Sequence, residues 1–365
     1  MKCLRVPLLA CAAVLALAAC SLPERLGELL PGARRESLAL KPDSRTDETR
    51  HIIRLAFHGG ASWPRQSRSL LPAHAGALTF KGCLETLTGG AVAVALYPEG
   101  TLGTPAETLA LVCAGGIEGA FTSGAAGALY PPLQLINLPH AFDSPEALWD
   151  FFDNSELWRE LCGDFADATG LVVLGAAQNG TLNFSNSRLP VTSPADLRGL
   201  KIAVPDTPIH GVLVEALGGR PLVMPPGERR EALVKGDADG TQGVLWDMDA
   251  RRWYTAQKYL TLDSHAYAES LLVMNGALLA ALPEEYRRAV RQAAREAEQM
   301  ARLTETLLSR SLDYPVMDTF LEVHRLTQAE RGAFREALRP VYDWLRGEIG
   351  GELVDRFMED TKARR

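Results

Sequence analysis

The 365-residue sequence lacks the features that mark several large classes of protein. It has no GxSxG, HExxH, P-loop or dinucleotide-binding motif, so we expect neither an enzyme nor a cofactor. It has no surplus of basic residues, since 38 Lys and Arg stand against 45 Asp and Glu, and a net charge of -7 argues against nucleic acid as a partner. Beyond the N-terminal segment, no apolar run approaches the length that crosses a membrane.

Cysteine is also scarce where it would matter for a folded domain. Three of the six cysteines fall in the first 20 residues, and the remaining three, Cys83, Cys113 and Cys162, are widely spaced with no Cys-x-x-Cys pair. This pattern argues against a disulfide framework and against a zinc site. We therefore predict buried thiols and no bound metal.

The first nineteen residues predict an export signal. Lys2 and Arg5 precede an apolar stretch over residues 6–16, which is too short for an ordinary transmembrane helix. The stretch ends in Leu-Ala-Ala-Cys20, which resembles the lipobox of bacterial lipoproteins. The resemblance implies cleavage before Cys20 and lipidation of Cys20, which places the protein on the periplasmic side of a bacterial membrane, held there only by its acyl chains. A plain signal peptide cut near Ala19 is the alternative.

The remainder of the chain alternates between strand and helix patterns. Residues 21–48 carry scattered prolines and charges and predict a flexible tether. From residue 51 onward, strands over 51–58, 91–97 and 118–123 are separated by helices over 67–88 and 104–113, which indicates a parallel or mixed sheet covered by helices. A second block of the same kind begins near Leu171 and continues through residues 201–204 to Gly236. Residues 283–312 contain no Gly or Pro after Pro283, so we predict one long helix there, better placed along two domains than inside one.

Five sequence segments in order resemble the DctP-like solute-binding proteins of tripartite ATP-independent periplasmic (TRAP) transporters. They are TGGAVAV with YPEGTLG (88–103), NLPHAF (137–142), NGTLNFSNS (179–187), DLRGLKIAVP (196–205) and the block from Asp239-Gly240 through QKYLTL (239–262). Each motif is weak alone, but the series covers residues 52 to about 357.

The resemblance implies an α/β, two-lobed fold of the periplasmic binding protein type II kind, with the long helix bridging both lobes. It implies lobe I over 49–178 plus 268–307 and lobe II over 179–267 plus 308–358, leaving 359–365 as a charged tail. A small-molecule ligand binds between the lobes and closes them by a hinge motion. The loaded protein then delivers its solute to membrane permease subunits.

At three positions the sequence departs from the family pattern. Typical members hold an organic acid through arginine, because a guanidinium group matches a carboxylate. The positions that match these arginines are Ala203 and Leu182 here. A segment in which the family frequently has a polar asparagine reads Gln242-Gly243-Val244 here. Since a buried anion without a cation is costly, we expect a neutral or largely hydrophobic ligand rather than a simple carboxylate. The ligand-contacting residues that this hypothesis predicts are His58, Ser123, Asn179, Leu182, Asn183, Ala203, Gln242, Gly243, Trp246 and His265.

Simpler interpretations remain open for several of these residues. Trp246 is at least as typical of a core residue as of a ligand contact, and His58 and His265 are typical of structural histidines. Asp247 and Asp249, with Arg251 nearby, indicate a solvated helix face. Loss of the arginines is also compatible with a non-transport ligand sensor or a protein-interaction module on the same fold, or with a lipid-anchored transport protein that works with a helical-repeat partner.

Overall fold

The computed structural model describes residues 51–58, 71–311 and 315–364. The predicted signal peptide, Cys20 and the tether lie outside these residues, as does the start of the helix predicted from residue 67. No helix in the described ranges is both long and apolar enough to cross a membrane.

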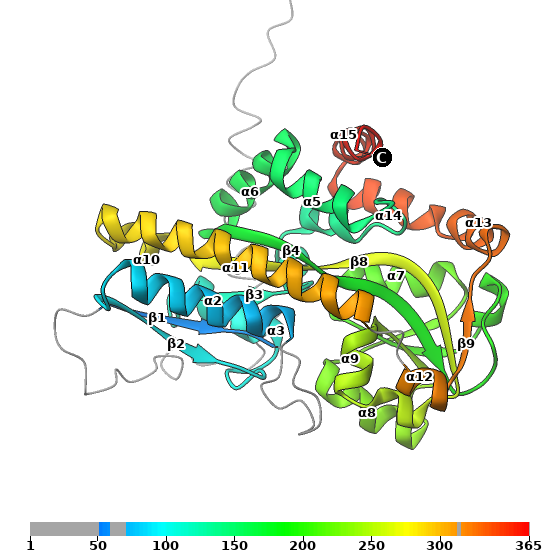
Figure 1. The fold of residues 1–365 in the computed structure, drawn as a ribbon. Helices are drawn as coiled ribbons and strands as arrows, with labels where there is room; N and C mark the ends of the chain where they lie inside the picture. The colour runs from blue at the N-terminus through cyan, green and yellow to red at the C-terminus, as the bar shows by residue number, and fades with distance from the viewer. Residues whose placement is uncertain (1–50, 59–70, 312–314, 365) are drawn as a thin grey trace, which may run out of the picture.

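One nine-stranded mixed sheet runs through the whole molecule (Figure 1). Its order is β2-β1-β3-β8-β4-β7-β5-β6, and β9 pairs with β8 outside this path. We call the half that holds β1, β2 and β3 the first lobe and the half that holds β5, β6, β7 and β9 the second lobe. The strands are β1 (His51–Ala56), β2 (Val92–Tyr97), β3 (Gly119–Thr122), β4 (Leu171–Asn186), β5 (Lys201–Val204), β6 (Arg220–Val223), β7 (Gly240–Val244), β8 (Tyr259–Asn275) and β9 (Glu322–Arg325).

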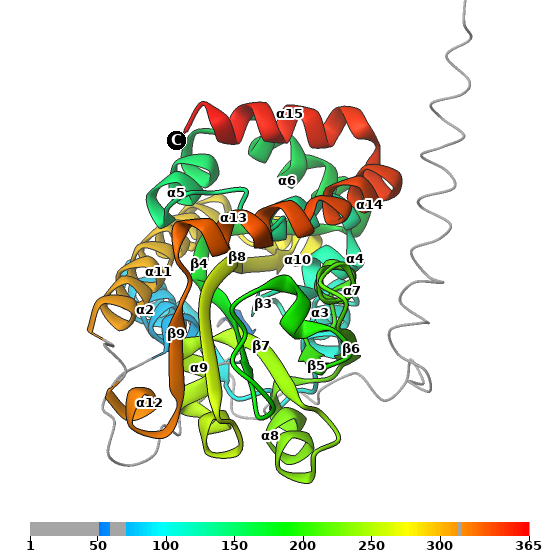
Figure 2. The same cartoon turned by 90° about the vertical axis from the view of Figure 1, so that its right-hand side faces the viewer.

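Helices cover both faces of this sheet. They are α2 (Pro72–Leu87), α3 (Pro105–Cys113), α4 (Ala125–Leu129), α5 (Pro145–Asn154), α6 (Glu156–Thr169), α7 (Pro208–Ala216), α8 (Pro226–Lys235), α9 (Leu245–Ala250), α10 (Gly276–Ala281), α11 (Glu284–Ser311), α12 (Pro315–Phe320), α13 (Gln328–Ala337), α14 (Arg339–Ile349) and α15 (Gly351–Lys362). Short 3-10 helices are η2 (Pro131–Asn137), η3 (Pro194–Leu197) and η4 (Trp253–Ala256). Figure 2 shows β9 beside β8, and α13 to α15 lying across one side of the molecule.

Alternating side chains on the first-lobe strands create two separate cores. Ile53 and Leu55 on β1 point toward α2 and α11, whereas Ala56 joins the core beneath α3, α5 and α6. The same period of two divides Leu272 from Leu271 on β8. The sheet is therefore buried on both faces, as parallel strands with helical crossovers require.

The long helix α11 lies along the molecule over α2 and β4 (Figure 1). It spans 28 residues, so its length is about 42 Å at the usual rise. Small side chains line its buried face, with Ala293, Ala297 and Ala301 fully buried at a spacing of four residues. They allow a close approach to α2, where a Cβ on Gly76 would lie 3.1 Å from the carbonyl oxygen of Ala297. The helix thus ties the first lobe to the strand that leads into the second.

Two long strands carry the chain between the lobes. In its first half β4 pairs with the part of β8 that follows Glu269, and in its second half it pairs with β7 and with the start of β8. The ladder is irregular between Gln178 and Thr181 and again between Leu182 and Phe184, and Ser264 on β8 has a φ of 47°. Irregular pairing and a left-handed residue concentrated at the crossing mark the place where the sheet bends.

Candidate functional site

A cavity of about 350 Å³ lies between the two lobes. From the first lobe it is lined by residues that follow β1 and β3 and by the start of α3. From the second it is lined by residues that follow β5, β6 and β7. Ligand sites in open α/β sheets gather at the carboxyl ends of strands, and the volume is in the range of small-molecule pockets.

Seven of the ten residues predicted from the sequence line this cavity: His58, Ser123, Asn179, Leu182, Gln242, Gly243 and Trp246. They come from both lobes and from the crossing strand β4. These seven residues therefore converge on one site, although they are separated by up to 188 positions along the chain (246 − 58).

Three predicted residues are not among those that line the cavity: Asn183, Ala203 and His265. Asn183 spans β4 and β8, because its Oδ1 accepts from the Ser264 amide at 3.0 Å while its Nδ2 donates to the Thr181 carbonyl at 3.0 Å. Ala203 is fully buried and packs in the second-lobe core with Leu233 and Trp253. In the structure Asn183 links β4 to β8 by a hydrogen bond, and Ala203 is a core residue.

His265 reaches the cavity only through its neighbour Gln242. Its ring stacks on Phe184 with centroids 4.5 Å apart, and its Nδ1 lies 2.7 Å from Oδ2 of Asp263. Since Nδ1 donates to that carboxylate, Nε2 accepts from Nε2 of Gln242 at 2.8 Å. The same amide nitrogen lies 3.2 Å from Nδ1 of His210, whose pKa is lowered to about 3 by burial, so His210 is neutral and accepts as well.

These contacts fix the orientation of the Gln242 amide. With its nitrogen held by two imidazoles, Oε1 is left as an acceptor without any partner among the described residues. Gln242 thus presents a hydrogen-bond acceptor on a residue that lines the cavity.

Gly243 has a packing role beside its place in the cavity wall. A Cβ at this position would lie 2.8 Å from Cζ3 of Trp253, closer than side chains tolerate. The absence of a side chain therefore admits the Trp253 ring from the core, in addition to the place of Gly243 in the cavity wall.

The apolar wall of the cavity is continuous. Leu182, Val244 and Trp246 form one cluster with Leu71, and each is less than a tenth exposed. The indole nitrogen of Trp246 donates to the Asn179 carbonyl at 3.0 Å, so the ring is held in a fixed position. Trp246 is both a core residue and a cavity residue, which joins the two interpretations that its sequence left open.

Two arginines that the sequence motifs did not single out for the site also line the cavity, Arg229 on α8 and Arg251 after α9. Arg251 bonds Oδ1 of Asp247 at 2.5 Å, and Asp247 lines the cavity as well, so this pair is not a solvated helix face. The premise that the cleft contains no cation is therefore wrong. A signal was present: Arg229 lies four residues before the buried Leu233, on the same face of a helix.

Several buried polar atoms of the lining residues have no hydrogen-bond partner among the described residues. They are Oγ1 of Thr122, Oδ1 of Asn179, Oγ1 of Thr207, Nη2 of Arg229 and Oε1 of Gln242. Buried polar groups are ordinarily satisfied, so these atoms need water or a ligand in the cavity as their partners. His58 is neutral near pH 7, because burial and the charge of Arg251 lower its pKa to about 4.

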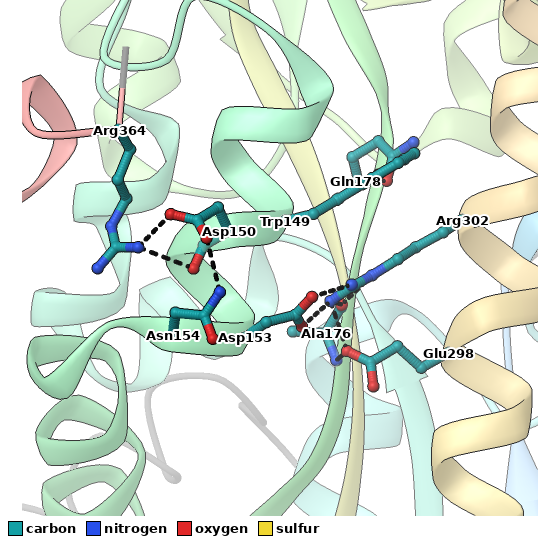
Figure 3. Close-up of polar contacts among 9 residues, drawn as sticks. All are labelled: Trp149, Asp150, Asp153, Asn154, Ala176, Gln178, Glu298, Arg302 and Arg364. Atoms are coloured by element: carbon teal, nitrogen blue, oxygen red, sulfur yellow. Dashed lines mark hydrogen bonds and ion pairs between the residues drawn. The ribbon is translucent and has the colours of Figure 1, made fainter.

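On the opposite side of the crossing, a polar network braces β4 against α5 and α11 (Figure 3). Arg302 on α11 bonds both carboxylate oxygens of Asp153 at 2.8 Å, the Ala176 carbonyl at 2.8 Å and Oε1 of Glu298 at 2.7 Å. Gln178, the residue before Asn179, accepts from the Trp149 indole and donates to Glu305. One face of the bend is therefore tied to the bridging helix while the other faces the cavity.

Comparison with known proteins identifies the architecture. Residues 66–347 match the model of the bacterial extracellular solute-binding protein family 7, or DctP. The chain belongs to this family. It is 28% identical over 299 residues to the 2,3-diketo-L-gulonate-binding periplasmic protein YiaO of Escherichia coli. The aligned region covers 79% of this chain and 84% of YiaO. It is also 28% identical over 289 residues to the C4-dicarboxylate-binding periplasmic protein DctP of Rhodobacter capsulatus, which covers 78% and 85%.

Solved structures of solute-binding proteins share the fold. The sugar acid binding protein DctPAm from Advenella mimigardefordensis, in complex with galactonate, superposes with a TM-score of 0.79 at 24% identity and covers 87% of this chain and all (100%) of its own. A TRAP periplasmic solute binding protein from Sulfurospirillum deleyianum with bound succinate gives 0.75 at 24%, covering 85% and 98%. The two-lobed α/β class predicted from the sequence is confirmed, and the chain is a bacterial extracellular solute-binding protein of the DctP family.

The exact lobe boundaries stay a prediction. The C-terminal helices of this family 7 protein contact elements on both sides of the proposed division, since α15 packs on α5 and α6 while α14 packs on α7 and η2.

Proposed function

We propose that this family 7 protein captures a solute with a largely apolar body, unlike small hydrophilic acids. The observation that carries the proposal is the wall formed by Leu71, Leu182, Val244 and Trp246. Leu182 occupies a position where the family pattern has arginine. Since two guanidinium groups also line the cavity, the proposal concerns the body of the ligand and not the charge of its polar end.

The energetic argument is simple. Each methylene that leaves water for an apolar wall contributes about 0.8 kcal/mol, or roughly a fourfold gain in affinity. A small polyhydroxylated acid gains nothing from such a wall and leaves its hydroxyl groups desolvated beside Leu182 and Val244.

Calorimetry with a homologous series tests this directly. Straight-chain and phenyl-substituted compounds with one polar end are compared with succinate and galactonate. We expect affinity to rise with chain length until the cavity is filled, and succinate and galactonate to bind at least tenfold more weakly. Tighter binding of succinate or galactonate than of every longer compound would overturn the proposal.

A substitution in the wall provides the second test. Leu182→Asn introduces an unsatisfied amide, and we expect it to weaken the best member of the series at least tenfold. The matched control is Leu87→Asn, because Leu87 is 46% exposed on α2 and does not line the cavity. Equal affinities of the two variants would contradict the assignment of Leu182.

We further propose that the protein is anchored to a membrane through an acylated Cys20. The support is the short apolar segment that ends in Leu-Ala-Ala-Cys20 and the tether after it. The wild-type chain should partition into the detergent phase of a bacterial extract and carry an acylated N-terminal cysteine by mass spectrometry. Cys20→Ala should abolish both, while Cys83→Ala should change neither. An unmodified Cys20, or a mature N-terminus elsewhere, would exclude the anchor.

A further inference from the structure

Arg229 is a buried cation whose hydrogen bonding is incomplete. The residue is 1% exposed and lines the cavity between the lobes. Its Nη1 donates to the Gln242 carbonyl at 2.7 Å, its Nε lies 3.3 Å from the Met224 carbonyl, and the guanidinium carbon lies 5.3 Å from the centre of the Trp253 ring. Nη2 has no partner among the described residues.

No carboxylate of the described chain forms an ion pair with Arg229. The acidic cavity residue Asp247 is bonded to Arg251 instead, and Asp206 lies exposed. Burial lowers the pKa of Arg229 to about 10, with the charge of Asp247 opposing and that of Arg251 adding to this effect, so the group stays protonated at neutral pH. A buried charge of this kind costs stability unless an opposite charge joins it.

The position of Arg229 is unfavourable for the protein alone. It lies in the first turn of α8, where the helix macrodipole disfavours a cation. Its Nη1 is 3.4 Å from Oγ1 of Thr241, which in turn bonds the Ala203 carbonyl at 3.2 Å. The Thr241 hydroxyl therefore links the guanidinium to the backbone at Ala203. Ala203 stands at the position where the family pattern has its principal arginine.

We propose that Arg229 is the residue that selects the polar end of the ligand, and that this end is a single anionic acceptor, such as one carboxylate, on an otherwise apolar molecule. The proposal rests on the proposed function, since the apolar body is the part that the wall of Leu182 and Trp246 receives. It assigns the charge recognition to α8 rather than to β5.

The surroundings limit the ligand to one such group. Because Nη1 and Nε already donate to backbone carbonyls, only Nη2 is available, and the head group is held by one charge-assisted bond rather than by a two-pronged pair. The unpartnered oxygens of Gln242 and Asn179 belong to residues that line the same cavity, and they would repel a second carboxylate placed beside them. The other cavity arginine, Arg251, is already paired with Asp247, so a dicarboxylate loses the hydration of its second charge and gains little in return.

Matched pairs of acid and amide test the head group independently of the body. The probes are hexanoate, octanoate, decanoate and 3-phenylpropionate, each beside its primary amide, measured by calorimetry and thermal shift. We expect the acids to bind at least about tenfold more tightly than the amides, as a charge-assisted bond is worth that factor over a neutral one. Arg229→Met should reduce this ratio to near one, and Arg229→Lys should retain part of it.

The matched control is Arg230→Met, because Arg230 is the exposed neighbour on the same helix. It should leave the acid-to-amide ratio unchanged. The melting temperature separates function from structure: we expect Arg229→Met to melt no lower than the wild type, because the cost of the unpaired cation is removed.

Three outcomes would overturn the assignment. They are equal affinities of acid and amide for the wild type, an unchanged ratio in both Arg229 variants, or no binding by any member of the panel. If the ratio collapses in Arg229→Met while succinate still binds more tightly than the longer acids, the head-group assignment stands and the proposed apolar body fails. The reverse pattern, with chain-length dependence but no acid preference, leaves the proposed function and removes this inference.

Discussion

Arg302 and Arg229 lie on opposite sides of the bend in β4, and they differ in how completely they are bonded. Arg302 has two carboxylates, a carbonyl and the face of Trp149 around it. Arg229 is more deeply buried, with 1% of the residue exposed against 12% of the Arg302 side chain, yet it has two carbonyls, a distant hydroxyl and no carboxylate. An arginine that serves the fold is saturated, whereas one that serves a ligand keeps a donor unused.

The largest effect is expected from Arg302→Met. Removing this cation leaves Glu298 and Asp153 without their partner, and we expect a loss of about 3 kcal/mol in the free energy of unfolding, measured by urea denaturation. Arg295→Met on the exposed face of the same helix should cost less than about 0.5 kcal/mol. Similar losses for both variants would show that the network in Figure 3 does not brace the bend.

Gly243→Ala should have the next largest effect, on the cavity side. The new Cβ would meet Trp253 at 2.8 Å, so we expect a loss of about 1–2 kcal/mol from overpacking, read from the urea midpoint. Gly82→Ala is the control, since Gly82 lies in α2 with nothing within 4 Å of its added Cβ, and there we expect a gain of about 0.5–1 kcal/mol. A gain at both positions would mean that Trp253 moves freely.

A smaller effect concerns pH on the braced side. Burial raises the pKa of Glu305 above its ordinary value of 4.5, so the folded protein binds more protons than the unfolded chain between 4.5 and that raised value. The contribution of Glu305 is therefore fully present below 4.5 and is lost as the pH rises through the folded pKa. Glu305→Gln should flatten this decline in urea titrations between pH 4.5 and 8. An unchanged pH profile would show that Glu305 is ionised in the fold as easily as in water.

The smallest stability effect is expected from Arg229→Met. Its unfolding free energy should equal that of the wild type or exceed it by up to about 1 kcal/mol, because an unpaired buried cation contributes little to the fold. Guanidinium or urea titration of Arg229→Met beside Arg302→Met makes the comparison direct. A loss at Arg229 as large as that at Arg302 would remove the distinction between the two arginines.

The sequence allowed the scaffold to be predicted better than the site. The long helix was predicted over 283–312 and occupies 284–311, because Pro283 and Pro315 bracket a run without Gly or Pro. The strand predicted over 91–97 occupies Val92–Tyr97. The residues within and beside such elements determine where they begin and end, so the local sequence is enough to predict them.

The cavity depends on which face of each strand is turned inward, and that is a property of the assembled sheet. Ala203 stands at a motif position, yet its side chain points into the second-lobe core. Arg229 was missed because only the positions where the family carries polar residues were compared. A cation at any other position of the chain escapes such a comparison. His265 was predicted to contact the ligand. In the structure its side chain instead bonds the amide of Gln242, which lines the cavity.

The central place of β8 in the sheet constrains how the protein can acquire its structure. This strand lies between β3 and β4 and also pairs with β9. The strands near residues 120, 180 and 323 therefore cannot complete their hydrogen bonding until residues 259–275 have joined the sheet. Neither lobe is a contiguous stretch of chain that could be completed first. Pairings of such long sequence separation slow folding and leave strand edges open in the meantime. We therefore expect a chain truncated before residue 259 to yield no independently folded lobe.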